Sequence, residues 1–146
     1  MTYATLYENV TPVVPYLKVD DAGRPWLLGF RCRSCNYLHV GVRLGCSRCT
    51  AVNQFDEVKL AETGRIYVPT VVYRSFPGVS VPFADVIVDL DDGAHLHGSL
   101  RMPLASPELI PFDMPVQVTY RKTKLRGRGD EDFLIFEFVP NEEAVR

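Results

Sequence analysis

Alternating apolar and polar residues dominate the chain after residue 60. Such alternation is typical of strands, because successive side chains on a strand point to opposite faces. Turn-forming residues separate the runs. The pattern predicts five strands, at residues 65–74, 83–90, 94–101, 115–121 and 132–139. Five is the strand count of an OB-fold barrel, and the proline-bounded segment 106–113 lies where that fold usually carries its helix.

The hairpin between the second and third predicted strands can be specified to the residue. A two-residue turn would set apolar residues of one strand against polar residues of the other. A three-residue loop that ends at Gly93, with this glycine in a left-handed conformation, instead pairs Val88 with Leu96. The same register places Asp89 opposite His95 on the other face of the hairpin, where a carboxylate and a protonated imidazole can pair.

The first thirty residues are rich in apolar and aromatic side chains, but Pro12, Pro15 and Pro25 exclude one long helix. We predict a short helix over residues 3–9, followed by an extended arm. An arm of this kind cannot bury its side chains against itself, so it packs on the body of the protein or on another protein.

The four cysteines form two CxxC pairs that ten residues separate: Cys32, Cys35, Cys46 and Cys49. Two short turns at this spacing can bring four thiolates around one tetrahedral ion. We therefore predict a rubredoxin-like zinc ribbon with one structural Zn²⁺ per chain. Iron in the same site and a dithiol redox pair are the alternatives. With four protein ligands the ion keeps no open position for water or substrate.

The complete prediction is a mainly β protein with an arm, a ribbon, a barrel and a tail. The predicted segments are the N-terminal helix and extended arm (1–28), the zinc ribbon (29–58), the five-stranded OB-fold barrel (59–140) and the tail (141–146).

Composition changes this picture little. A formal net charge of −2 gives no overall attraction to phosphate backbones or anionic membranes. No apolar run approaches the ~18 residues of a membrane-spanning helix, and the start of the chain lacks a secretory signal. We expect a cytoplasmic protein with no membrane role, for which nucleic-acid binding is disfavoured.

Two segments are candidate partner or ligand surfaces. The apolar loop 75–83 and its neighbouring aromatic residues could form an interface, and a basic stretch before the last strand could meet nucleic-acid phosphates, coenzyme A phosphates or an acidic protein. That stretch could equally be a solvated hairpin tip. The residues are Tyr73, Phe76 and Phe83 in the first segment, and Lys122, Lys124, Arg126 and Arg128 in the second.

No catalytic residues are predicted. The sequence has no phosphate-binding glycine loop, no dinucleotide fingerprint, no nucleophile elbow and no cysteine outside the CxxC pairs. His95 and His97 share a strand face but have no evident third metal ligand, so solvated or interface histidines are expected. His39 is expected to be exposed, and nothing in the sequence pairs or buries Glu137.

The order of motifs resembles the DUF35 family of ribbon and OB-fold proteins. The ribbon is followed by Thr63-Gly-Arg-Ile-Tyr67, by Thr70-Val-Val-Tyr73, and by the strand Pro82–Leu90 with its Asp92-Gly93 turn. The resemblance runs from about residue 25 to 139 and carries over only the four cysteines as ligands.

The resemblance implies a non-catalytic subunit that bridges thiolase-like and ketoacyl-synthase-like proteins and can contact acyl-CoA. The proline-rich aromatic start and the length are similar to small subunits of bacterial complexes that acetylate phloroglucinol-type aromatics in secondary metabolism. A single-stranded nucleic-acid-binding protein is the first alternative function, and an acyl-CoA-binding protein is the second.

Overall fold

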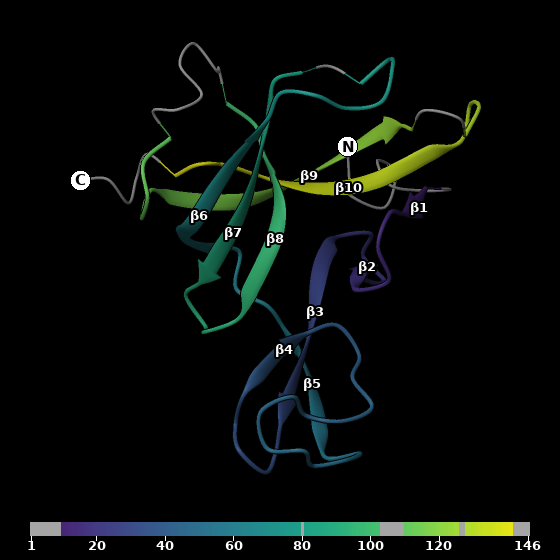
Figure 1. The fold of residues 1–146 in the computed structure, drawn as a ribbon. Coiled ribbons are helices and arrows are strands. Elements are labelled where there is room, and N and C mark those ends of the chain that lie inside the picture. The colour runs from purple at the N-terminus through teal and green to yellow at the C-terminus, as the bar shows by residue number, and fades with distance from the viewer. Residues whose placement is uncertain (1–9, 80, 103–109, 126–127, 142–146) are drawn as a thin grey trace. The chain divides into compact units, whose positions relative to one another are not determined.

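The computed structural model describes residues 10–79, 81–102, 110–125 and 128–141, and all regular structure in these ranges is β (Figure 1). The helix predicted at residues 3–9 lies outside them. Of the segment predicted to carry the barrel helix only residues 110–113 are described, and they form no helix. Within these ranges no helix is long and apolar enough to span a membrane.

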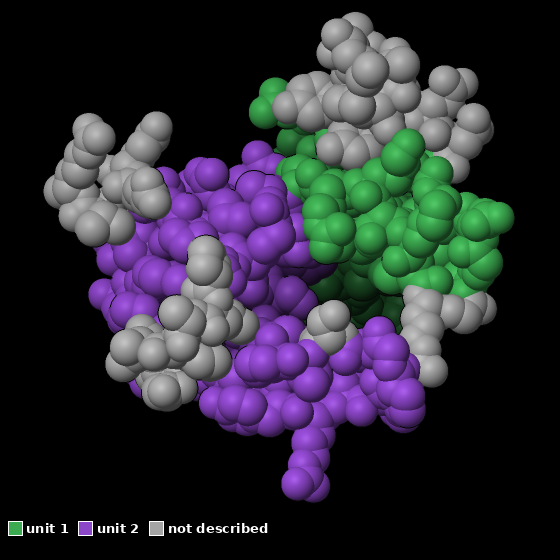
Figure 2. Space-filling model, turned by 90° about the horizontal axis from the view of Figure 1, so that it is seen from above, with its two compact units in different colours: residues 1–60, 92–94, 120–135 green, residues 61–91, 95–119, 136–146 purple. Residues whose placement is uncertain are grey.

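The chain forms two compact units, which Figure 2 shows in different colours. One unit contains residues 1–60, 92–94 and 120–135, and the other contains residues 61–91, 95–119 and 136–146. Each unit gathers segments that are distant along the chain, so the units do not correspond one to one to the four consecutive segments predicted from the sequence. The predicted segment boundaries therefore stay predictions.

The ribbon in the first unit is built around one long strand. Its strands are β2 (Leu17–Val19), β3 (Pro25–Cys32), β4 (Leu38–Val40) and β5 (Phe55–Lys59). β3 pairs antiparallel with each of the other three strands. Leu27, Leu28 and Leu38 are buried, and the rings of Phe30 and Phe55 stack with centroids 5.1 Å apart. This small apolar core positions the turns that carry the cysteines.

The described part of the arm packs on the chain itself. Strand β1 (Thr11–Pro12) runs parallel to β10 (Asp132–Pro140), with Thr11 opposite Phe133. The backbone N–H of Val13 donates to the carbonyl of Leu134 over 3.0 Å. Packing on the chain's own body, one of the two expectations for the arm, is confirmed for these residues.

The closed barrel has the predicted strand count. Its strands are β6 (Thr63–Val72), β7 (Phe83–Leu90), β8 (His95–Leu100), β9 (Pro115–Lys124) and β10. They follow the order β10-β8-β7-β6-β9, and a further pairing between β9 and β10 closes the sheet. β6, β7 and β8 form an antiparallel meander, whereas β8 and β10 are parallel where Leu100 lies opposite Phe138. This topology is the predicted OB-fold barrel.

The β7–β8 hairpin has the predicted register. Val88 pairs with Leu96 and Asp89 with His95, and the φ of Gly93 is 99°, in the left-handed region. Both apolar residues are buried, because this register turns the apolar face of each strand into the barrel.

Two glycines allow close packing within the barrel. A Cβ on Gly64 would lie 2.9 Å from the Cα of Leu90 and against the carbonyl oxygen of Asp89. A Cβ on Gly98 would lie 2.9 Å from the ring of Phe136. Larger residues at either position would force backbone or ring displacement.

Candidate metal centre

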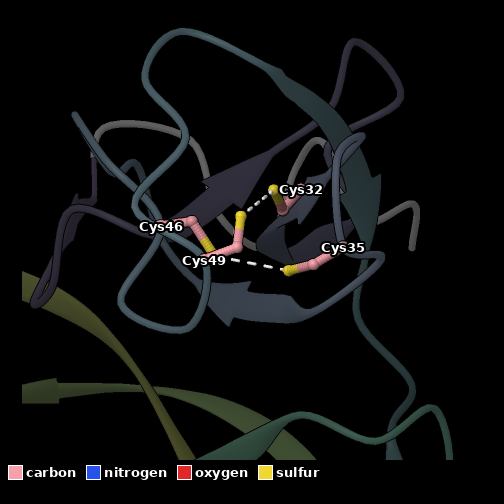
Figure 3. Close-up of side chains that lie close together, drawn as sticks. All are labelled: Cys32, Cys35, Cys46 and Cys49. Carbon is pink, nitrogen blue, oxygen red and sulfur yellow. Dashed lines mark hydrogen bonds between the residues drawn. The ribbon is translucent and has the colours of Figure 1, made fainter.

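The four cysteine side chains converge at one end of the ribbon (Figure 3). All four Sγ atoms lie within 4.8 Å of one another, and the pairs Cys32–Cys49 and Cys35–Cys46 are 3.6 Å apart. A tetrahedral ion with Zn–S bonds of about 2.3 Å would hold sulfurs about 3.8 Å apart. A disulfide would need about 2.05 Å. The spacing therefore fits four ligands around one ion.

The two CxxC turns have the same local structure. In each, the carbonyl of the first cysteine accepts a hydrogen bond from the N–H four positions later, over 2.8 Å in the first turn and 2.9 Å in the second. The N–H of the first cysteine donates to the carbonyl five positions later, over 2.9 Å in both. The residue four positions on has a positive φ, 69° at Asn36 and 67° at Thr50. Because the two turns share this structure, each directs its two thiols toward the same point.

His39 is buried beside the cluster, so the expectation that it is exposed was wrong. Its exposed fraction is 5%, and its Nε2 lies 3.4 Å from Cys46 Sγ. Tyr37 and Phe55 pack edge-on against the imidazole, with centroids at 4.8 and 5.9 Å. With the proton on Nε2, His39 donates to this sulfur, as does the backbone N–H of Arg48 over 3.4 Å.

The thiols influence one another strongly in the absence of a cation. Burial opposes ionisation of Cys46, but hydrogen bonds from His39 and from the backbone N–H groups of residues 49 and 48 outweigh it and lower its pKa to about 5. The backbone N–H of Tyr37 lowers the pKa of Cys35, yet burial and the three neighbouring thiols together raise it to about 12. Adjacent sulfurs cannot all carry negative charge alone, and a divalent ion removes this conflict. The donor set thus suits a thiolate-bound metal such as zinc.

Arginines surround the cluster and fix its loops. Arg31 donates to the carbonyl of Asn36 over 3.1 Å, and Arg33 makes an ion pair with Asp56 at 3.8 Å. The guanidinium of Arg48 lies 5.7 Å from the ring centroid of Tyr37. These cations partly offset the negative charge of four thiolates.

Asp132, on the strand that follows the basic stretch, forms ion pairs with two lysines of that stretch. Lys124 Nζ lies 2.9 Å from Asp132 Oδ1, and Lys122 Nζ lies 3.9 Å from the second oxygen. The hydrogen bond with Asp132 raises the pKa of Lys124 and lowers that of the carboxyl. Arg128 lies over the ring of Phe133, and Arg126 is outside the described residues. The predicted role of this stretch as a ligand surface stays a prediction.

The apolar loop between β6 and β7 presents two of its three predicted residues to solvent. Tyr73 and Phe76 are exposed, whereas Phe83, the first residue of β7, is half-buried. This loop therefore has the exposure that a partner surface needs, and its role also stays a prediction.

Three further polar side chains have defined partners. His95 Nδ1 lies 2.6 Å from Asp89, as the hairpin register predicted, and His97 Nε2 lies 3.9 Å from Asp85. Glu137 is buried and accepts a hydrogen bond from Arg101 Nε over 2.8 Å, a pairing that the sequence did not reveal. Alternation along β10 offered no signal for it, because the partner Arg101 follows directly after β8, in a distant part of the sequence.

Comparisons with known proteins find similarities to OB-fold and DUF35 proteins. The model of the C-terminal OB-fold domain of ChsH2 matches residues 57–121. A Methanocaldococcus jannaschii protein described as a DUF35 domain-containing scaffold protein is 28% identical over 119 residues, which are 80% of this chain and 82% of that protein.

Two further similarities involve proteins named for larger assemblies. The benzoylsuccinyl-CoA thiolase subunit BbsA of Geobacter metallireducens is 29% identical over 81 residues, 56% of this chain and 54% of that subunit. The solved structure entitled Ltp2-ChsH2(DUF35) aldolase superposes with a TM-score of 0.58 at 25% identity, covering 79% of this chain and 84% of that one. With its closed barrel and four-cysteine ribbon, the chain is similar in sequence and fold to DUF35 proteins.

Proposed function

We propose that the chain is a non-catalytic bridging subunit of a thiolase-associated complex. The observation that carries the proposal is the similarity to a protein named as a thiolase subunit, over 81 residues at 29% identity. A relative named as a scaffold protein and a relative solved with an aldolase support it. The match to the thiolase subunit spans about half of that subunit, so the assembly partner is part of the proposal.

The metal centre supports a structural role. We propose that Cys32, Cys35, Cys46 and Cys49 hold one Zn²⁺, which would join the two turns of the ribbon. Four protein ligands fill a tetrahedral shell, so the ion would have no position for substrate. Elemental analysis of the purified protein should find one zinc per chain. One iron per chain, with the colour of an iron–thiolate site, would contradict the assignment.

A finer proposal names the chemistry of the complex. The partners would be a thiolase-like and a ketoacyl-synthase-like subunit, and the complex would transfer acetyl groups to phloroglucinol-type aromatics. This proposal rests on the similarity in the arm and in length described above. The reacting groups would then lie on the partner subunits.

Co-expression tests both the bridging role and the acyl-transfer chemistry. The tagged chain is produced with the thiolase-like and synthase-like proteins of its source organism, and the eluate is analysed by light scattering and acyl-transfer assay. A complex of fixed ratio, with acyl transfer in the complex and none with the chain alone, is the expected result. A chain that stays alone, or that binds a single-stranded oligonucleotide with steep salt dependence, contradicts the proposal and favours nucleic-acid binding.

A further inference from the structure

The loop that carries the second CxxC turn displays apolar side chains to solvent. We call residues 41–52 the ribbon tip. Within it Leu44 is 85% exposed, Val42 65% and Val52 59%. The apolar interior of the ribbon is formed by other residues, including Leu28 and Leu38. The exposed side chains of the tip therefore do not serve the ribbon's own core.

The ribbon tip is held in one conformation by hydrogen bonds and by the cysteine cluster. Gly45 and Val52 form an isolated antiparallel bridge, which brings the backbone beside Leu44 close to Val52. The N–H of Cys46 donates to the carbonyl of Ala51 over 2.9 Å, and the side chains of Cys46 and Cys49 join the cluster. A rigid apolar surface loses little conformational entropy when it binds a partner.

The charge around the tip defines the partner that would fit. Residues 29–54 contain four arginines and no aspartate or glutamate, in a chain whose net charge is −2. Arg43 and Arg48 lie within the tip and are exposed. Among the described residues Arg43 makes no ion pair. A complementary surface would accept the apolar side chains in a depression and carry carboxylates at its rim.

Other classes of partner fit less well. The tip has no aromatic residue on which a nucleobase could stack, and two arginines are few for a phosphate backbone. Leucine and valine between arginines suit a protein interface with an apolar centre and a charged rim.

We propose that the ribbon tip docks into an acidic-rimmed apolar depression on the thiolase-like partner subunit. The inference rests on the proposed function, because it names the surface through which that subunit is held. Leu44 would fill the depression, and Arg43 and Arg48 would pair with the rim carboxylates.

Affinity of the zinc-loaded full-length chain for the purified thiolase-like subunit of the source organism tests the proposal. Leu44→Asp should weaken binding by about 30-fold or more, the loss typical of an interface hot spot. Leu44→Ser is a milder second variant, and Arg43→Glu should slow association and reduce its dependence on salt. Phe112→Asp is the matched control, because this side chain is 69% exposed but lies outside the ribbon.

The outcomes separate the two proposals. If the wild-type chain does not bind the subunit, the proposed function fails. If the wild-type chain binds the subunit, and both Leu44→Asp and Arg43→Glu bind it with wild-type affinity, the docking proposal fails while the proposed function stands. Loss of affinity confined to preparations that have lost zinc, or a Leu44-dependent affinity for a single-stranded oligonucleotide, also overturns the docking proposal. Weakened binding by Leu44→Ser with full zinc content supports it.

Discussion

Replacing His39 with phenylalanine would isolate the contribution of one hydrogen bond to metal affinity. The imidazole packs between Tyr37 and Phe55, and a phenyl ring can keep that packing. The change removes the Nε2 donor that lies 3.4 Å from Cys46 Sγ, and leaves the backbone N–H of Arg48 as a donor to the same sulfur.

The expected loss follows from the strength of this contact. A hydrogen bond to a charged group contributes about 1.5–3 kcal/mol, and loss of a group that supports a metal ligand lowers affinity about 10- to 100-fold. We therefore expect His39→Phe to weaken zinc binding about 30-fold, which corresponds to about 2 kcal/mol.

Competition with a chromophoric zinc chelator measures this loss. His97→Phe is the control, because that imidazole is exposed on β8 and contacts Asp85. The reasoning is refuted if His39→Phe and His97→Phe both hold zinc within about twofold of the wild-type affinity, a difference of about 0.4 kcal/mol.

Four further changes test other parts of the structure. Thr50→Asn should raise the melting temperature of the metal-loaded protein by relieving about 1 kcal/mol of left-handed strain, since asparagine tolerates this conformation; an unchanged or lower value would contradict it. Gly64→Ala should lower the unfolding free energy by about 1–3 kcal/mol, whereas Gly45→Ala, whose Cβ would have its nearest neighbour at 3.6 Å, should lower it less in the same denaturant titration. The hydrogen bond from Lys124 lowers the pKa of Asp132, so its stabilisation is present above the ordinary carboxyl value and is lost as pH falls through the lower folded value. Asp132→Asn should therefore flatten the stability profile below about pH 4, and a profile of wild-type steepness would count against the pair. Metal removal by a chelator should collapse the chemical-shift dispersion of the NMR signals of β3–β5 while the signals of β6–β8 stay dispersed, and a simultaneous collapse of both sets would show that the barrel also needs the metal.

Local patterns in the sequence were sufficient to predict the barrel and the cysteine cluster. Alternation set the faces of β7 and β8, and the need to match those faces fixed the pairing of Val88 with Leu96. CxxC spacing specified the cluster in the same local way, because each turn needs only its own six residues.

Contacts between distant segments could not be predicted in this way. His39 is buried because Phe55, sixteen residues later, returns on β5 to cover it. Glu137 is buried because the parallel pairing of β8 and β10 brings Arg101 to it. A single sequence shows the polar residue in each case and does not show which distant strand will lie over it.

The parallel pairing of β1 with β10 has a consequence for synthesis on the ribosome. Thr11 pairs with Phe133, so β1 has no partner until β10, more than a hundred residues later in the chain, has been made. The cysteines are complete by residue 49, whereas barrel closure needs β10, which ends at Pro140. The four cysteines can therefore gather around a metal ion while the chain is still growing, whereas the barrel cannot close until β10 has been made.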